Sequence, residues 1–321
     1  MTGWGIAGCG WVARDHALPG LLAAGAEVVA LHDRSVEAMD RMPVTSVRHT
    51  DVGAFLATPG LDAVYVATPN AAHRPLVEAA AAAGKAVLCE KPLAADVLDA
   101  ELMVTACRQV LLGTAFDQRW HPAHVRLRGL LHELGTVTAV RIVYACWLPG
   151  DWTPDGQVHD NWRVDAAVAG GGAAIDLAPH GLDLAGVLLG EDVVELHALT
   201  QTRVHDYAVD DGALLHGRTA GGVLVDLHVA YNVPDALPRR RLEVTGTLGT
   251  AVAVDTMGQT AGGSLALLAP DPVDVPFDDA SPFEAQFRAF SAAVDGDPLA
   301  WPYDAQRDLR LHRLLLEALR A

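Results

Sequence analysis

The stretch Trp4-Gly5-Ile6-Ala7-Gly8-Cys9-Gly10-Trp11-Val12-Ala13 decides the fold class of this chain. A short apolar run leads into the pattern G-x-G-x-x-A, which starts at Gly8 and ends at Ala13. Small residues at these positions allow a tight strand-to-helix turn, and they let backbone amides approach a pyrophosphate at a helix N-terminus. The pattern therefore predicts a dinucleotide-binding turn, with these candidate cofactor contacts: Gly8, Cys9, Gly10, Trp11 and Val12.

The residues after the turn support this interpretation. A segment that can form a helix follows, and a second apolar run, 27–31, stops just before Asp33. Asp33 lies 20 residues after Ala13, where a carboxylate can accept hydrogen bonds from ribose hydroxyls. The alternative is that Asp33 caps a helix starting near Ser35. Arg34 comes next, and an arginine there can accommodate a 2′-phosphate, so the residues favour NAD and leave NADP open.

Composition restricts the class of protein. The 321 residues are enough for two domains with a large core. With 23 basic and 40 acidic side chains the net charge is −17, which argues against a nucleic-acid partner. The sequence has no run of 18 apolar residues and no basic N-terminal region, so neither a membrane span nor a signal peptide is indicated. We therefore expect a soluble cytoplasmic protein.

Two residue types are informative because they are few. The cysteines are scattered without metal-ligand spacing, so we expect reduced, mostly buried thiols and no metal. They are Cys9, Cys89, Cys107 and Cys146. The only lysines are Lys85 and Lys91, whereas arginine supplies every other basic side chain. A lysine in this chain is therefore expected to serve a purpose beyond positive charge.

Strands and helices alternate through the first third of the chain. This rhythm requires parallel strands with right-handed crossovers, which is the doubly wound α/β arrangement. The later strands of the series are expected at 63–67, 86–89 and 110–113, and the helices between them at 74–83 and 96–108. The rhythm changes after Arg119, so we place the dinucleotide-binding domain at 1–117.

The remaining residues, 118–321, predict a second domain for substrate binding and oligomerisation. Gly170-Gly171-Gly172 begins a helix that continues through Leu189. Alternating apolar runs then indicate strands at 193–204, 213–218, 223–231, 241–246 and 251–254. We expect an α+β domain with a large, open, mainly antiparallel sheet and helices on one face, closed by helices at 283–294 and 305–320.

Polar segments follow three of the expected parallel strands, where ligands of doubly wound sheets bind. They are Thr68-Pro69-Asn70, Glu90-Lys91-Pro92 and Asp117-Gln118. At such a position the Lys91 amine can donate to a substrate oxygen or exchange a proton. The alternative is a solvated cation paired with Glu90, but the strand-end position and the scarcity of lysine favour a function. The sequence leaves open whether the bond before Pro92 is cis.

Asp176 and His180 form a second candidate pair. They are four residues apart and share a helix face. A carboxylate orients an imidazole and supports its protonated form, as a general acid/base requires. The alternative is a weak surface pair, yet Pro179 and Gly181 both weaken a helix and are not chosen for stability.

In these motifs the chain resembles the Gfo/Idh/MocA oxidoreductases. The matching segments run in order along nearly the whole chain: Gly8-Cys9-Gly10, Ala67-Thr68-Pro69-Asn70 with His73, Glu90-Lys91-Pro92, Trp162-Arg163, Asp176-x-x-x-His180 with Asp183, and Glu243-Val244-x-Gly246-Thr247-x-Gly249-Thr250. The resemblance implies an N-terminal Rossmann domain, a C-terminal domain with a large open sheet, and NAD or NADP in the cleft between them.

The resemblance also implies roles for individual residues. Lys91, Asp176 and His180 are expected to meet the reacting hydroxyl, and Trp11 departs from the residues usual at its position. Further cofactor contacts are expected from Thr68, Pro69, Asn70, His73, Glu90, Lys91 and Gln118. Substrate contacts are expected from His159, Asn161, Trp162 and Tyr231.

The activity implied is reversible hydride transfer between nicotinamide and a secondary hydroxyl or carbonyl of a sugar, cyclitol or related polyol. His180 is expected to take the hydroxyl proton while Lys91 donates to the oxygen, although the sequence leaves open the reverse assignment. Two alternatives are glycoside cleavage through transient oxidation and a non-catalytic nucleotide-binding subunit. The intact set of Lys91, Asp176 and His180 argues against the second.

An open sheet with helices on one face leaves its other face to be covered. The run 223–231 alternates apolar residues, and we expect them to form an apolar patch that a partner subunit covers. The chain is therefore predicted to be a homodimer or a dimer of dimers.

Overall fold

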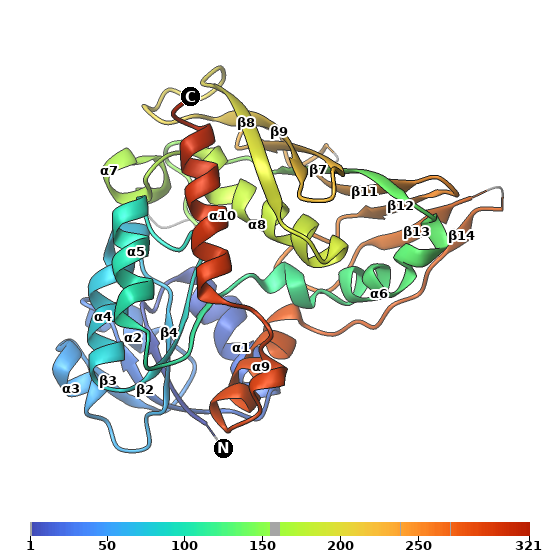
Figure 1. Cartoon of the computed structure of the whole chain (residues 1–321). Coiled ribbons are helices and arrows are strands. Elements are labelled where there is room, and N and C mark those ends of the chain that lie inside the picture. The colour runs from blue at the N-terminus through green and yellow to red at the C-terminus, as the bar shows by residue number, and fades with distance from the viewer. Residues whose placement is uncertain (1, 155–160, 238, 270) are drawn as a thin grey trace. The chain divides into compact units, whose positions relative to one another are not determined.

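The computed structural model describes residues 2–154, 161–237, 239–269 and 271–321 (Figure 1). The chain divides into two compact units. The first comprises Met1–Ala115 with Phe283–Arg310, and the second Phe116–Pro282 with Leu311–Ala321. Residues 283–310, which we had assigned to the second domain, therefore group with the first unit.

The first unit is built on a parallel sheet of six strands in the order β3-β2-β1-β4-β5-β6. This order and the parallel pairing confirm the doubly wound Rossmann prediction. The strands are β1 (Gly3–Ala7), β2 (Glu27–His32), β3 (Val47–His49), β4 (Ala63–Val66), β5 (Ala86–Cys89) and β6 (Leu112–Thr114). β3 was not among the strands expected from the sequence, because a strand of three residues is too short to show periodicity.

Side-chain caps start several helices of the first unit. Ser35, Asp51 and Asp96 each accept a hydrogen bond from the backbone amide three residues ahead. The helical segments are the π-helical η1 (Ala13–Ala17), α1 (Leu18–Ala23), α2 (Val36–Asp40), α3 (Val52–Leu56), the 3-10 turn η2 (Asn70–Ala72), α4 (His73–Ala82), α5 (Val97–Ala106), α9 (Pro282–Val294) and the 3-10 turn η6 (Pro298–Ala300). Phe287 and Phe290 of α9 contact the buried Trp4 ring at 5.2 and 5.6 Å between centroids, which anchors α9 to this unit.

The second unit is built on a sheet of eight strands in the order β14-β13-β12-β11-β7-β10-β9-β8. Only β7 and β10 pair in parallel within the described part of this sheet, so the mainly antiparallel prediction is confirmed. The strands are β7 (Val137–Ala145), β8 (Val193–Gln201), β9 (Gly212–Thr219), β10 (Leu224–Ala230), β11 (Arg240–Gly246), β12 (Thr250–Val254), β13 (Ser264–Leu268) and β14 (Val273–Asp274).

One long helix, α8 (Ala173–Leu189), forms the centre of the core of the second unit and packs against β7, β8, β9 and β10 (Figure 1). The segment Ala166–Leu189 is apolar and long enough to cross a membrane, but 83% of its most apolar window is buried in the structure. It is the core helix of a soluble protein. The other helical segments are η3 (Asp117–Trp120), α6 (Pro122–Leu130), η4 (Leu131–Leu134), η5 (Trp162–Val164), α7 (Ala166–Ala169) and α10 (Ala305–Ala318), which starts in the first unit.

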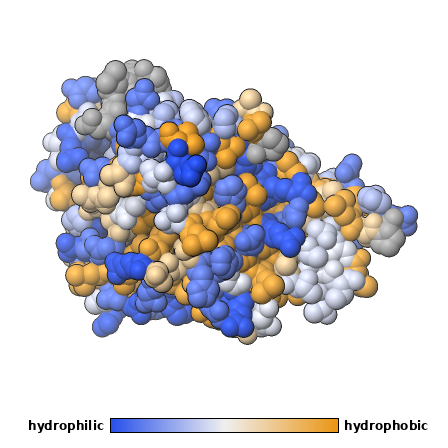
Figure 2. Space-filling model, turned by 90° about the horizontal axis from the view of Figure 1, so that it is seen from above, coloured by the Kyte–Doolittle hydropathy of each residue, from blue (hydrophilic) through white to orange (hydrophobic). Residues whose placement is uncertain are grey.

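The sheet face opposite α8 is mixed in character. In β10 the apolar residues Val225, Leu227 and Val229 belong to the buried core, whereas Leu224 on the other face is 61% exposed. The prediction that the alternating residues of 223–231 form an apolar outer patch is therefore wrong, because the period of two assigns that apolar set to the face that α8 covers. Figure 2, which shows the whole molecule from above, has hydrophobic residues lying among hydrophilic ones.

Candidate active site

The glycine turn fits a dinucleotide, and its two glycines fit for different reasons. Gly8 has a φ of +94°, and an added Cβ would lie 2.6 Å from the carbonyl oxygen of Ala67, so the chain itself requires glycine there. Gly10 is exposed, and a Cβ on it would meet nothing within 4 Å. The space beside Gly10 would let a ligand approach the backbone closely.

Asp33 connects the end of β2 to this turn. Its Oδ2 accepts a hydrogen bond from the Cys9 amide at 2.8 Å, and its Oδ1 accepts one from the Ser35 amide at 2.9 Å. The carboxylate is thereby fixed beside the turn while each oxygen retains a lone pair for a ribose hydroxyl. Burial raises the pKa of the Cys9 thiol to about 12, so this cysteine is a packing residue.

Arg34, which could affect the choice between NAD and NADP, and Trp11, which could stack on a ligand, differ in exposure. Arg34 is exposed at the start of the loop after β2. Trp11 is half-buried and contacts the His16 ring edge-to-face at 5.2 Å, while His16 stacks on Phe283 at 5.6 Å. The indole is thus supported by a short aromatic column within the first unit.

His73 supports the loops after β4 and β5 from behind. Its side chain is fully buried, with Nε2 2.9 Å from the carbonyl oxygen of Thr68 and Nδ1 3.2 Å from that of Leu93. Burial lowers the pKa of His73. Both ring nitrogens face carbonyls of the chain, so His73 holds Thr68-Pro69-Asn70 against the Glu-Lys-Pro segment, and its expected direct contact with the cofactor stays a prediction.

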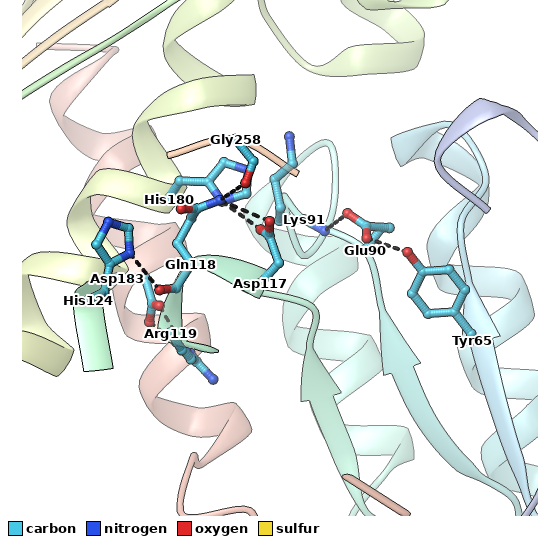
Figure 3. Close-up of polar contacts among 10 residues, drawn as sticks. All are labelled: Tyr65, Glu90, Lys91, Asp117, Gln118, Arg119, His124, His180, Asp183 and Gly258. Atoms are coloured by element: carbon cyan, nitrogen blue, oxygen red, sulfur yellow. Dashed lines mark hydrogen bonds and ion pairs between the residues drawn. The ribbon is translucent and has the colours of Figure 1, made fainter. Parts of the chain in front are cut away.

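The Glu90-Lys91-Pro92 segment is held from below by Tyr65 (Figure 3). The Tyr65 hydroxyl donates to Glu90 Oε1 at 2.5 Å, and Glu90 Oε2 accepts from the Lys91 amide at 3.2 Å. The Lys91–Pro92 peptide bond is cis. The other lysine, Lys85, donates its Nζ to the Leu61 carbonyl at 2.8 Å and so has a structural partner.

His180 lies on α8 in the second unit and is 5% exposed. Its Nδ1 is 3.5 Å from Asp117 Oδ1 of η3, and its ring contacts the edges or faces of Phe116 and Tyr144. Gln118, a candidate cofactor contact, is buried and donates its amide to Asp117 Oδ2 at 2.9 Å and to the Gly258 carbonyl at 3.1 Å (Figure 3). Its side chain therefore supports Asp117.

Asp176 is held by a residue that we had expected to touch substrate. The hydroxyl of the fully buried Tyr231 donates to Asp176 Oδ2 at 2.7 Å. Burial and the Asp176 charge raise the pKa of Tyr231 well above its ordinary value, so it acts as a neutral donor. The carboxylate oxygen 3.5 Å from His180 Nδ1 belongs to Asp117. Our expectation that Asp176 also orients His180 stays a prediction.

Two further sets of contacts that hold α8 in place were not predicted from the sequence. Arg119 donates from Nε and Nη2 to both oxygens of Asp183 at 2.8 Å, and both side chains are fully buried. At the helix start, Asp210 accepts from the amides of Gly172 and Ala174 at 2.9 and 2.7 Å. The residues of each pair are distant in sequence, so no local pattern predicts their contact. Among them, Asp183 belongs to a motif of the resemblance to known proteins.

The loop expected to bind substrate is described only in part. His159 lies outside the described residues. Asn161 donates to the Pro149 carbonyl at 3.2 Å and accepts from the Arg163 amide at 3.3 Å, so its amide shapes the loop. The Arg163 guanidinium lies 4.6 Å from the Trp162 ring centre and 5.5 Å from that of Trp152.

The described residues provide no cluster of three or more His, Cys, Asp or Glu side chains that could hold a metal. The first unit thus presents a glycine turn and polar strand ends, and the second unit presents a carboxylate and an imidazole on α8. These groups can hold a dinucleotide, donate to an oxygen and exchange a proton.

Comparison with known proteins matches both units to one family. Residues 2–111 match the oxidoreductase family with an NAD-binding Rossmann fold, and residues 125–252 match the GFO/IDH/MocA C-terminal domain. The chain is 34% identical over 307 residues to 1,5-anhydro-D-fructose reductase of Ensifer adhaerens, an alignment that covers 92% of this chain and 89% of that protein.

Solved structures agree with this match over the full length. Aldose-aldose oxidoreductase from Caulobacter crescentus, complexed with glycerol, has a TM-score of 0.85 at 25% identity and covers 100% of this chain and 97% of its own. A point mutant of KijD10, a 3-ketoreductase from Actinomadura kijaniata, in complex with TDP-benzene and NADP, has a TM-score of 0.81 at 26% identity and covers 99% of this chain and 97% of its own. Another neighbour was solved with NAD.

The glycine turn gives a direct test of cofactor binding. Gly10→Ala should leave thermal stability within about 0.5 kcal/mol of wild type, because its Cβ meets open space. The same Cβ enters the volume assigned to the pyrophosphate, so the dissociation constant for NAD measured by calorimetry should rise by at least about tenfold.

Gly8→Ala is the matched control for this test, since its Cβ and its φ both conflict with the chain. We expect it to lower the free energy of unfolding by about 1 kcal/mol or more. A Gly10→Ala protein that bound NAD like wild type would contradict the proposed position of the cofactor.

Proposed function

This chain belongs to the Gfo/Idh/MocA family of NAD(P)-dependent oxidoreductases, which act on sugar or inositol hydroxyl and carbonyl groups. We propose that it transfers hydride between NAD and a secondary carbinol of a sugar or cyclitol. In this proposal His180 and Lys91 contact the oxygen atom of the reacting carbinol. The observation that supports these roles best is the setting of His180. The His180 imidazole is nearly buried, and its Nδ1 faces the Asp117 carboxylate. We therefore propose that its other ring nitrogen, Nε2, exchanges the substrate proton.

When bound at the glycine turn, a nicotinamide cofactor would supply the hydride chemistry, which is oxidation of the carbinol or, in reverse, reduction of the carbonyl. Negative charge develops on the substrate oxygen as the carbinol is oxidised, so a base that removes the hydroxyl proton lowers the barrier. His180 takes that proton and Lys91 donates to the oxygen, although exchange of these two roles would serve the same chemistry. Asp176, fixed by Tyr231, accepts from a second substrate hydroxyl.

The relatives suggest which substrates to test first. Among the similar proteins are 1,5-anhydro-D-fructose reductase and an inositol 2-dehydrogenase of Saccharopolyspora erythraea. We propose a substrate with the same chemical feature, a ring carbonyl or secondary hydroxyl flanked by a further hydroxyl. Such a substrate could engage both His180 and Asp176.

Substitution of the two proposed proton-handling residues tests the function. His180→Ala and Lys91→Ala should each keep the dissociation constant for cofactor near the wild-type value, while turnover falls by at least about a hundredfold. Lys85→Ala is the matched control, because Lys85 binds the Leu61 carbonyl, and it should turn over substrate at close to the wild-type rate. Near wild-type turnover by both His180→Ala and Lys91→Ala would place the active site elsewhere.

We propose that NAD is preferred over NADP, because the fixed Asp33 carboxylate repels a 2′-phosphate and accepts from ribose hydroxyls. Dissociation constants of the two cofactors, measured by fluorescence titration, should favour NAD for wild type and lose that preference in Asp33→Ser. Tighter binding of NADP that disappears in Arg34→Ala would show instead that Arg34 governs the choice.

We also propose that the protein forms a homodimer or a dimer of dimers through the outer face of its eight-stranded sheet. Leu199 and Leu214 are cross-strand partners there, 68% and 47% exposed, and Arg141 lies between Asp226 and Glu243 in register. Light scattering at micromolar concentration should give at least twice the mass of the chain, and Leu214→Arg should lower it. A wild-type monomer mass would rule the proposal out.

The free state of all four cysteines accords with a cytoplasmic location, which we propose on that basis. Recovery of the enzyme in the secreted or periplasmic fraction of its source cells would contradict it.

A further inference from the structure

We propose that Asp117 is the positioning residue of His180, holding the Nδ1 edge of the imidazole so that Nε2 is the nitrogen that exchanges the substrate proton. This inference rests on the proposed role of His180. It assigns to Asp117 a function that the sequence pattern gave to Asp176.

The geometry around the ring fixes its direction. Asp117 Oδ1 lies 3.5 Å from His180 Nδ1, and the two residues are 4% and 5% exposed. The rings of Phe116 and Tyr144 contact the imidazole at 6.3 and 5.5 Å between centroids, with interplanar angles of 75° and 66°. An imidazole confined by two rings and a carboxylate presents one defined nitrogen to a substrate.

The carboxylate is itself held in place. Gln118 donates to Asp117 Oδ2 at 2.9 Å and ties it to the Gly258 carbonyl at 3.1 Å (Figure 3). Two residues after Asp117, Arg119 forms the buried ion pair with Asp183, which is three residues after His180 on α8. The turn η3 therefore contacts α8 at two positions almost one helical turn apart, which prevents η3 from sliding relative to the imidazole.

The charges facing the ring come from several elements. From β7, Tyr144 is neutral because burial raises its pKa, and the Arg240 guanidinium of β11 lies 5.4 Å from the Tyr144 ring centre. On α8 itself, Asp176 is held by Tyr231 and Asp183 is paired with Arg119. Asp117 is a carboxylate at ion-pair distance from His180, and it stabilises the imidazolium that forms when His180 takes a proton.

Asp117→Asn separates this role from a merely structural one, because it keeps the side-chain shape and removes the charge. In the oxidation direction neutral His180 is required, so kcat/KM rises with pH through the pKa of His180. Loss of the carboxylate makes the imidazolium less stable, so the acid limb of the profile, where kcat/KM rises with pH, should move to lower pH by about one unit. In the reduction direction protonated His180 is required, and the alkaline limb should move down equally.

Asp210→Asn is the matched control. It makes the same change at the start of α8, where Asp210 accepts from the amides of Gly172 and Ala174. Ala174 lies six residues before His180, about 9 Å along the helix. This control should leave the pH of both limbs unchanged even if it lowers the rate.

A titration of the imidazole itself gives a readout independent of turnover. The NMR signal of His180 in histidine-labelled protein, assigned by its absence from His180→Gln, should titrate at lower pH in Asp117→Asn than in wild type. Asp117→Ser serves the same comparison if Asp117→Asn does not fold.

The outcomes distinguish this inference from the proposed function. Unchanged limbs together with an unchanged His180 titration in a folded Asp117 variant would overturn the positioning role. Wild-type turnover by His180→Ala would instead overturn the proposed function, while a shifted His180 titration would still support the contact with Asp117.

Discussion

The buried ion pair between Arg119 and Asp183 fixes the helix that carries His180. Both side chains are fully buried and joined by two hydrogen bonds of 2.8 Å. Such a pair stabilises little compared with an apolar pair of the same shape, yet removing one partner typically costs about 3–5 kcal/mol, since it leaves a buried charge unpaired. The pair therefore contributes specificity: it sets where η3 meets α8, and with it the distance between Asp117 and His180.

The other candidate residues of the site are also held by buried side chains. Tyr231 fixes Asp176, Tyr65 fixes Glu90, and His73 joins the loops after β4 and β5 through two carbonyls. Each supporting side chain is fully buried, so its own packing fixes the group that it contacts. Groups held in this way undergo little reorganisation when charge develops on a substrate oxygen.

The sequence predicted the fold well, because its signals are local. Glycine spacing and period-two strands specify most of both sheets, whereas β3, β13 and β14 were not predicted. The outer face of the second sheet was misjudged, because the apolar residues that alternate along 223–231 are the ones buried under α8 and not the outer ones. The supports of the site were not predicted either: Arg119 with Asp183, Asp117 with His180 and Tyr231 with Asp176 are pairs distant in sequence, brought together only by the topology.

The central claim is direct transfer of hydride to a sugar-type carbonyl, and isotope transfer tests it most directly. The wild-type enzyme would be incubated with NADH deuterated at both C4 positions and with a panel that includes 1,5-anhydro-D-fructose and inososes. Mass spectrometry and NMR should find one deuterium on the newly formed carbinol carbon of the product, with one equivalent of NAD formed. Product without deuterium at that carbon, or turnover of a glycoside with no net change in NADH, would contradict the account.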